Sequence, residues 1–472
     1  MKAKRYFLAL FFTALAFSGC ESDKTDLSQP FVVGFANLSH DLTRMHDQDE
    51  IEMKLSEPAA SNGSVVIKVT PTNAQYGVDF ETTPSSESGT FEVPFLAGQT
   101  AISFTYENKI EQPYVEEDKL KSVRFSIFQI NYDSQVSIQG YTSTLVGFGI
   151  SLGATMEPEI GGPNQGNQVF IDLSTELVTT SRRDKWDLGF YSDDLSRVVI
   201  NGSLYMAAKQ LDATNIDAVT AASAQQYQSQ VAVGTFEASN VNYVDAPNGD
   251  ITKTAIAEIS ANDNDNKVYL LNLGYAVGTD VPPVGSVAVA GNPRGWKKIR
   301  ILKSGDNYVL QYADLNSTTH TEVTIPRSPD YNFTFFSFNT QNVVTVEPEK
   351  AKWDLNFTVF TNEIVGSGSY GYSDFVLNNL KAGVKVYRVN SPAGSTVNFG
   401  NFALANINDA NFTNDQRIIG AEWRDVFTGT AYTDRFYILK DIDGNYYKIK
   451  MMAFVNPGGV RGYPKFQYKL VQ

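Results

Sequence analysis

The chain carries the same three short patterns twice, in the same order. They are KWDLGF (185–190) and KWDLNF (352–357), NGSLY (201–205) and the looser GSY (368–370), and ILK…NY (301–308) and ILK…NY (438–446). Solenoid units repeat every 20–50 residues or so, and this period is much longer. The pattern therefore predicts two duplicated domains, or two halves of one domain, at 169–327 and 330–472.

Strand-like alternation runs through the rest of the chain. One-sided apolar alternation, as in Val65-Val-Ile67-Lys-Val69, is typical of half-buried strands, and further examples are Ile102-Ser-Phe104-Thr-Tyr106 and Val123-Arg-Phe125-Ser-Ile127. Several such strands at short spacing predict a β-sandwich over 31–148. The segments 76–80 (YGVDF), 89–91 (GTF) and 97–99 (AGQ) resemble Calx-β and related immunoglobulin-like modules. The fold class is therefore expected to be mainly β, with this sandwich first and the duplicated β-rich region after it.

Other local signals set the boundaries. Residues 149–168 are rich in Gly, Pro and Asn, which indicates a linker. Asp443-Gly444 between β-forming residues predicts a hairpin turn. The Ala- and Gln-rich stretch 213–230 predicts one helix among the strands.

The N-terminus has the order of an export signal. Lys2, Lys4 and Arg5 precede an apolar run over 6–17, and small residues then precede Cys20. The run is too short for the ~20 residues that a bilayer core needs. Residues 1–19 are therefore expected to be a signal peptide, and 20–30 a flexible tether.

Cys20 is the only cysteine, so no disulfide can form within the chain. The segment around it resembles the lipobox of bacterial lipoproteins, with Phe17 where Leu is usual. The resemblance implies lipidation of Cys20 with acyl chains such as palmitate, and each buried CH₂ contributes ~0.8 kcal/mol to anchoring. The acidic stretch 21–24 resembles the tether of surface-exported lipoproteins in Bacteroidetes-type envelopes. We therefore expect a lipid-anchored outer-membrane protein exposed at the cell surface.

The charge of the chain argues against one class of partner. Without residues 1–19 the chain has 35 Lys and Arg against 52 Asp and Glu, a net charge of −17. Such a surface repels phosphate backbones, so nucleic acid is not expected to bind.

The KWDLxF segment, the ILK hairpin and the closing strand Phe466-Gln-Tyr468 together resemble the HmuY family of lipoproteins. The resemblance spans about 165–472, counted over both copies. It implies a mostly β fold and, as in the founding members, capture of haem between two axial side chains. Trp186-Asp187 and Trp353-Asp354 are expected to be structural, because an indole buries a large apolar face and a carboxylate accepts an N–H at a strand end.

The axial ligands of haem-binding relatives, two His or two Met, lie between the Trp-Asp strand and the final hairpin. This chain has no His, Met or Cys over 211–295 or over 384–430, so no ligand position transfers. His320 and Met206 remain as candidate haem ligands, while His40 and His46 are expected to be solvated. The ligand is therefore open between haem and another small apolar molecule.

Other chemistry has weaker support in the sequence. Asp441-Ile-Asp443-Gly444 resembles the start of a calcium loop but lacks its further acidic ligands, and Asp79 and 116–118 hint at calcium in the sandwich.

With three scattered His and no phosphate loop or GxSxG segment, we expect no enzyme; a glycan-processing enzyme would need two paired carboxylates. The alternative to ligand capture is a structural or adhesive surface lipoprotein that binds glycan or protein.

Overall fold

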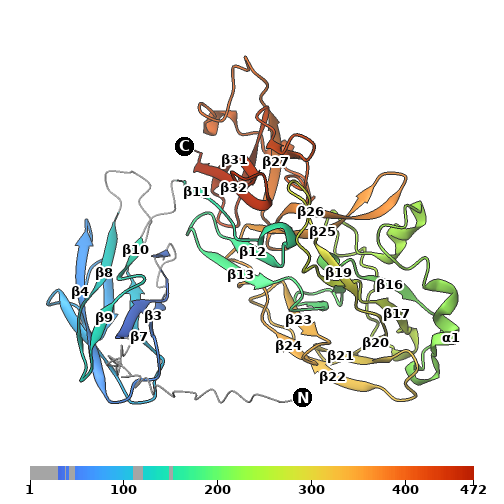
Figure 1. Ribbon diagram of the computed structural model, residues 1–472, viewed down its shortest axis with the longest axis horizontal. Coiled ribbons are helices and arrows are strands. Elements are labelled where there is room, and N and C mark those ends of the chain that lie inside the picture. The colour runs from blue at the N-terminus through green and yellow to red at the C-terminus, as the bar shows by residue number, and fades with distance from the viewer. Residues whose placement is uncertain (1–29, 38, 42–47, 110–120, 148–152, 472) are drawn as a thin grey trace, which may run out of the picture. The chain divides into compact units, whose positions relative to one another are not determined.

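The computed structural model describes residues 30–37, 39–41, 48–109, 121–147 and 153–471 (Figure 1). These residues are mainly in strands, as the sequence predicts. The described residues form two compact units, one over 30–147 and the other over 153–471. Cys20, His46 and 116–118 lie outside the described residues. No described helix is long and apolar enough to cross a membrane.

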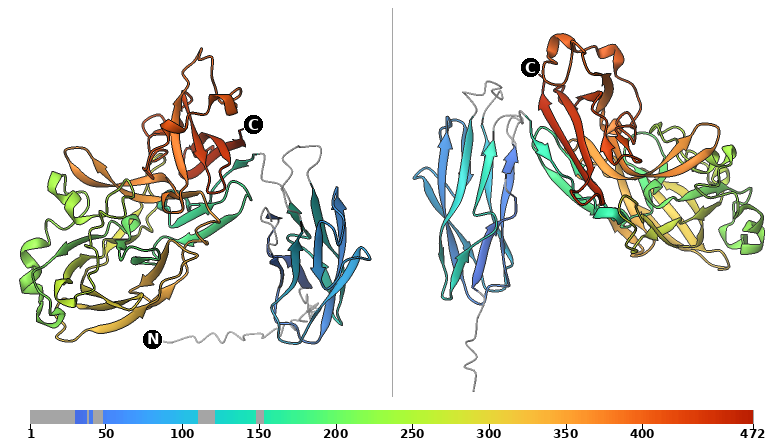
Figure 2. Two further views of the ribbon diagram at one scale, coloured as in Figure 1. Left: turned by 180° about the vertical axis from the view of Figure 1, so that it is seen from behind. Right: turned by 45° about the horizontal axis from the view of Figure 1, so that its top comes forward.

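The N-terminal unit is a sandwich of two five-stranded sheets (Figure 2). The first sheet runs β5 (Phe80–Thr83), β7 (Ala101–Asn108), β3 (Gln48–Leu55), β1 (Phe31–Phe35) and β9 (Val136–Ile138). The second runs β2 (Ser39–Asp41), β10 (Ser143–Gly147), β8 (Ser122–Asn131), β4 (Gly63–Thr72) and β6 (Thr90–Phe95). The alternating residues Ile67, Phe104 and Phe125 are buried between them.

The C-terminal unit has two outer and two inner sheets. The first outer sheet runs β16 (Ala207–Gln210), β17 (Tyr269–Asn272), β20 (Trp296–Ser304), β21 (Asn307–Asp314) and β22 (Thr321–Ile325). The first inner sheet runs β15 (Val198–Ile200), β14 (Leu188–Tyr191), β23 (Phe333–Ser337) and β24 (Asn342–Val344). Leu188, Ile301 and Phe336 belong to the core between these two sheets.

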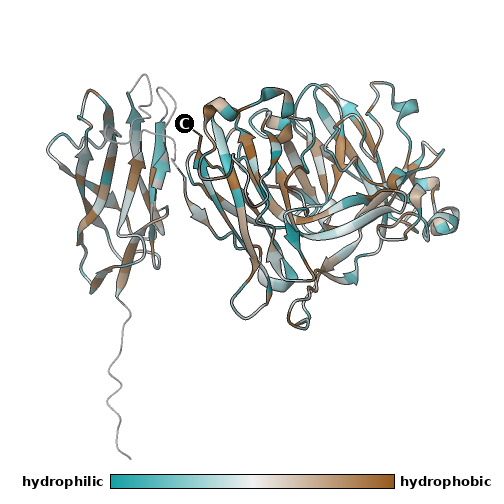
Figure 3. Ribbon diagram, turned by 90° about the horizontal axis from the view of Figure 1, so that it is seen from above, coloured by the Kyte–Doolittle hydropathy of each residue, from teal (hydrophilic) through white to brown (hydrophobic). Residues whose placement is uncertain are grey.

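The other two sheets repeat this plan. The second inner sheet runs β13 (Val178–Arg182), β12 (Asn167–Ile171), β25 (Leu355–Ile364) and β26 (Gly368–Asn378). The second outer sheet runs β11 (Thr155–Met156), β32 (Arg461–Leu470), β31 (Tyr446–Val455), β30 (Arg435–Lys440) and β27 (Lys385–Asn390). Val169, Leu355 and Tyr468 lie in the core between them. Apolar residues gather on the strands, as the brown segments in Figure 3 show.

The two repeats exchange strands. β14 of the first repeat pairs with β23 of the second, with Leu188 opposite Phe336. β12 of the first repeat pairs with β25 of the second, with Ile171 opposite Leu355. Each inner sheet therefore contains strands from both repeats, and neither repeat can complete its sheet alone.

Two local predictions have different outcomes. The hairpin at Asp443-Gly444 is confirmed, because β30 and β31 pair on either side of it and Gly444 has φ 91°. The single helix over 213–230 is wrong for most of its length, since only η4 (Ile216–Ala218), α1 (Ala221–Ala224) and η5 (Gln225–Tyr227) form. Extended residues at Val219 and Thr220 separate η4 from α1, and Thr220 caps α1 with its side chain.

Candidate functional site

The two Trp-Asp pairs lie where the repeats exchange strands. The Asp187 N–H donates to Phe336 O (2.8 Å), and the Asp187 carboxylate accepts the N–H of Phe338 (2.6 Å). In the same way the Asp354 N–H donates to Ile171 O (2.8 Å), and the Asp354 carboxylate accepts a backbone N–H at 2.8 Å, that of Leu173. Each carboxylate thus accepts a hydrogen bond from the backbone just after a strand of the other repeat.

The surroundings of these two carboxylates differ. Arg294 forms an ion pair with Asp187 at 2.7 Å. Asp354 instead lies near other carboxyl groups, and burial together with the charge of Asp172 raises the pKa of Asp354 well above its usual value. Asp187 and Asp354 therefore make equivalent backbone hydrogen bonds but have different electrostatic surroundings.

The indoles next to these carboxylates lie between the inner sheets. Trp353 packs edge-on against Phe170, with ring centres 5.0 Å apart, and Trp186 packs in the same way against Phe335 at 4.8 Å. The indole N–H groups of both Trp residues are buried and have no hydrogen-bond partner among the described residues. A buried indole N–H ordinarily finds a partner, so two unpaired ones at equivalent positions need an explanation.

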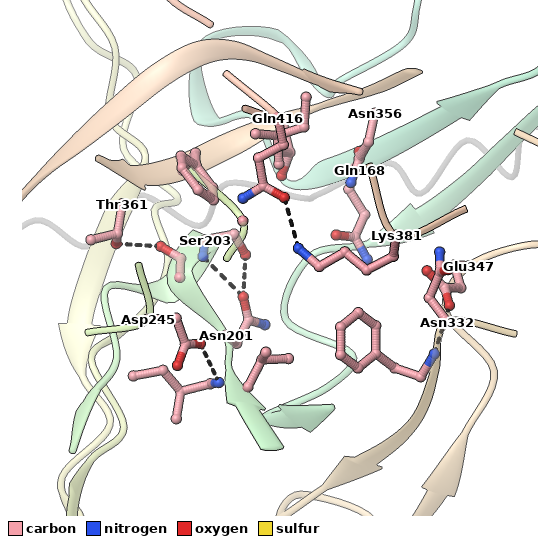
Figure 4. Close-up of a pocket in the computed structure, with 18 of the residues that line it drawn as sticks. Gln168, Asn201, Ser203, Asp245, Asn332, Glu347, Asn356, Thr361, Lys381 and Gln416 are labelled. Carbon is pink, nitrogen blue, oxygen red and sulfur yellow. Dashed lines mark hydrogen bonds between the residues drawn. The ribbon is translucent and has the colours of Figure 1, made fainter. Parts of the chain in front are cut away.

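Both indoles line a cavity of about 170 Å³ between the inner sheets (Figure 4). Strand alternation determines the lining: on β12, Val169 and Ile171 face the core, while Gln168 and Phe170 face the cavity. On β25, Asn356 lies opposite Phe170 in register and also faces the cavity. The cavity is therefore made jointly by the two repeats.

Two amides in this lining each have one atom without a hydrogen-bond partner in the described part of the chain. Gln168 is 4% exposed and Asn356 is 8% exposed. Gln168 Nε2 and Asn356 Oδ1 have no hydrogen-bond partner among the described residues. An unpaired buried polar group costs about 1–3 kcal/mol, and a ligand that pairs these atoms would recover that cost.

Two equivalent asparagines fix the tryptophan-bearing loops. Asn201 donates from Nδ2 to the carbonyls of Arg183 and Trp186, each at 2.8 Å. Asn379 donates from Nδ2 to the carbonyls of Lys350 (2.8 Å) and Trp353 (2.9 Å). They also cap η3 (Gly202–Leu204) and η8 (Leu380–Ala382). The position of each indole is thus set by a buried amide of its own repeat.

Lys381, the middle residue of η8, lines the cavity. Figure 4 shows the Lys381 side chain extended towards Gln416, and Nζ donates to Gln416 Oε1 at 3.1 Å. Burial lowers the pKa of Lys381 to about 8, against the opposing charges of Asp245, Glu347 and Asp250. Gly249 has φ 86°, and a Cβ there would lie 3.0 Å from Lys381 Nζ, so this loop approaches the lysine as closely as glycine allows.

The carboxylates around this lysine are held by backbone groups. Asp245 accepts the N–H groups of Ile200 and Ala255, each at 2.8 Å, and Glu347 accepts that of Phe333 at 3.0 Å. Burial raises the pKa of Asp245 to about 6 and that of Glu347 to about 8. Burial therefore favours the neutral, protonated form of both carboxyl groups.

The structure does not bring the two candidate haem ligands together. Met206 is buried in the core and lines the cavity. His320 lies just before β22 and its Nδ1 is 3.0 Å from Asp217 of η4. Met206 is the only lining residue of a type that ligates haem iron among the described residues, since His, Cys and Tyr are absent from that lining. The lining does not fit a haem with two axial ligands.

The other predicted sites have structural partners. Asp441 accepts the N–H of Asn445 (2.7 Å) in the hairpin turn, and Asp79 forms an ion pair with Lys121 (2.6 Å). His40 is not solvated as expected, because its side chain is 7% exposed and its Nδ1 lies 3.0 Å from Asp49. No group of three or more His, Cys, Asp or Glu arranged for a metal ion occurs among the described residues.

Sequence reasoning missed Gln168, Asn356, Glu347 and Lys381. The signal for the two amides is an Asn or Gln next to large apolar residues of a predicted strand, in QVFI (168–171) and LNF (355–357). Glu347 lies in a loop and Lys381 in the short helix η8, and neither gives a comparable signal.

The sequence pattern of the family described as HmuY protein matches residues 164–317 and again 330–468. The chain belongs to the HmuY family. The two matches confirm the duplication within this HmuY region. No functionally curated protein matches the chain.

Two solved structures resemble parts of the molecule. The apo-form Calx CBD1 domain is 14% identical with TM-score 0.21, over 25% of this chain and 96% of that domain. A putative carbohydrate binding protein from Bacteroides ovatus is 8% identical with TM-score 0.18, over 73% of this chain and 97% of that one.

Proposed function

We propose that this protein is a surface binding protein of the HmuY family that takes up a small molecule in the cavity between its two repeats. One observation carries the proposal: one cavity is lined by four buried polar atoms that have no hydrogen-bond partner in the described part of the chain, two indole N–H groups and two amide atoms. Ligand sites combine an apolar, aromatic lining with a few polar groups, and this cavity has both. A ligand that pairs these atoms regains the hydrogen bonds that folding leaves unmade.

The export of the protein is part of this proposal. The signal-like residues 1–19 and the lipobox-like segment ending at Cys20 support a lipid anchor in the outer membrane. A tether at 20–30 would hold the binding unit outside the cell, where a small molecule is captured before uptake. Haem coordinated by two axial ligands is not the occupant that we propose, because the cavity lining lacks such a pair.

Thermal unfolding tests the proposed site. The chain from residue 20, carrying Cys20→Ser, is heated with haem and with panels of monosaccharides, amino acids and carboxylic acids. We expect at least one of the three small-molecule panels to raise Tm and haem to give no shift of its Soret band. The rise should disappear in Val199→Phe, which fills the cavity from β15.

Val323→Phe is the matched control, because Val323 is also half-buried on an edge strand but lies outside the cavity lining. An equal rise of Tm in Val199→Phe would place binding elsewhere. No rise with any panel would remove the proposed function.

A further inference from the structure

The unpaired atoms of the cavity are mostly donors and all are uncharged. Three are donors, the indole N–H groups of Trp186 and Trp353 and Nε2 of Gln168, and one is an acceptor, Oδ1 of Asn356. A ligand that satisfies them needs both acceptor and donor groups close together. Hydroxyl groups do both, since each offers one O–H donor and two acceptor lone pairs.

The carboxylates near the cavity are already engaged by the protein. Both oxygens of Asp245 accept backbone N–H groups, and Glu347 accepts that of Phe333. Asp250 accepts the N–H and hydroxyl of Thr252 and pairs with Lys253 at 3.0 Å. These groups are poorly placed to hold a cationic ligand, because each is tied to its own loop or strand.

Lys381 is the charged group with donor capacity to spare. Its ammonium has three N–H donors, and one of them is used by Gln416 at 3.1 Å. Acidic side chains lie near this charge, Asp245 and Asp250 from the loop at 245–254 and Glu347 from the loop after β24. The remaining N–H donors therefore suit a neutral oxygen better than a second anion.

The aromatic residues of the lining indicate that the ligand also has an apolar face. Phe170, Trp353, Trp186 and Phe335 form two edge-on pairs at the cavity, and they present apolar surface beside the polar atoms. The cavity of about 170 Å³ is smaller than the ~300–1,000 Å³ of pockets for drug-sized ligands. It has room for one small ring with its substituents.

We propose that the cavity between the repeats binds a single neutral sugar ring, with Gln168, Asn356 and Lys381 bonding its hydroxyl groups and the two indole N–H groups donating to its oxygens. This inference rests on the proposed function and names the ligand class of the same site. The C–H faces of a sugar ring match the aromatic surface, and its hydroxyl groups match the unpaired polar atoms.

Calorimetric titration tests the ligand class. D-glucose, D-galactose, D-mannose and N-acetyl-D-glucosamine are titrated into the chain from residue 20 carrying Cys20→Ser. At least one should bind saturably with a dissociation constant of about 1 mM or tighter, which corresponds to −4.1 kcal/mol. Asn356→Leu, Gln168→Leu and Lys381→Met should each weaken that binding at least tenfold.

Ser181→Ala is the matched control. Ser181 faces Gln168 in register on β13, and its hydroxyl is also buried and unpaired, but it does not line the cavity. Its removal should leave sugar affinity unchanged. Circular dichroism checks that each variant is folded, and Lys381→Met keeps the test decisive if a strand variant is not, because Lys381 is half-buried in the short helix η8 and not in a strand.

The remaining outcomes separate failure of the sugar inference from failure of the proposed function. If amino acids or carboxylic acids bind and no sugar does, the sugar inference is overturned while the proposed function stands. Sugar binding of equal strength in all three cavity variants would also overturn the inference. If no panel binds, the inference and the proposed function both fail.

Discussion

Asp187 and Asp354 hold equivalent positions in the two repeats, and each accepts a backbone N–H of the other repeat, from Phe338 and Leu173. These reciprocal hydrogen bonds occur at the ends of the exchanged strands. They place the two indoles on either side of one cavity. The two repeats therefore form a single unit in which one cavity is lined by residues of both.

The two carboxylates should respond differently to the same substitution. Asp187→Asn leaves Arg294 without its buried partner, so we expect a loss of roughly 3 kcal/mol in the free energy of unfolding. Asp354→Asn keeps an acceptor for Leu173 and removes a charge that burial and Asp172 disfavour, so stability near pH 7 should stay level or rise. Urea unfolding measures both. Equal losses in the two variants would contradict this account.

Glu347 should make stability depend on pH. Burial raises its pKa from 4.5 to about 8 in the folded state, so the folded protein holds this proton more tightly than the unfolded chain. Its contribution to stability is present below pH 4.5 and is lost as the pH rises through about 8. Glu347→Gln keeps the acceptor for Phe333 and should reduce the fall in stability between pH 5 and pH 9. Urea unfolding at these two pH values measures the free energy of unfolding. The same fall in both proteins would contradict the raised pKa of Glu347.

Asn379 should be critical for both stability and binding. It is 1% exposed and holds the carbonyls of Lys350 and Trp353. Asn379→Ala leaves these groups unpaired, so we expect about 3 kcal/mol of destabilisation and weaker ligand binding. Asn215→Ala is the control, because Asn215 caps η4 at an exposed site and should cost only ~1 kcal/mol. Similar losses in the two variants, by thermal unfolding, would show that the buried amide has no special part.

Cys20 tests the proposed anchor. The full chain expressed with its signal segment should fractionate with membranes, and Cys20→Ser should be released, because the acyl chains provide the attachment. Ser18→Ala is a control that keeps the cysteine and a small residue before it. A Cys20→Ser protein that stays with the membrane fraction after a high-salt wash would contradict lipidation.

The sequence predicts the strands and the duplication well, because alternation and the KWDLxF repeat are local signals. It does not reveal that β14 pairs with β23 and β12 with β25, because alternation gives the buried face of a strand and not its neighbour. The cavity escapes prediction for the same reason. Its lining runs from Gln168 to Gln416 and depends on that long-range pairing. The helix expected at 213–230 fails because side-chain caps at Asn215 and Thr220 divide the segment into short turns.

The four tryptophans provide the most direct test of the cavity as the binding site. In a protein with ¹⁵N-labelled tryptophan, each indole N–H gives one NMR signal, assigned through Trp-to-Phe variants. Trp186 and Trp353 line the cavity with unpaired N–H groups, whereas Trp423 donates to Asp374 O in the core at 3.2 Å and Trp296 lies outside the lining. Binding of a small ligand should shift the signals of Trp186 and Trp353 saturably and leave those of Trp296 and Trp423 in place. A saturable shift confined to Trp296 or Trp423, or no shift with any ligand panel, would contradict a binding site between the repeats.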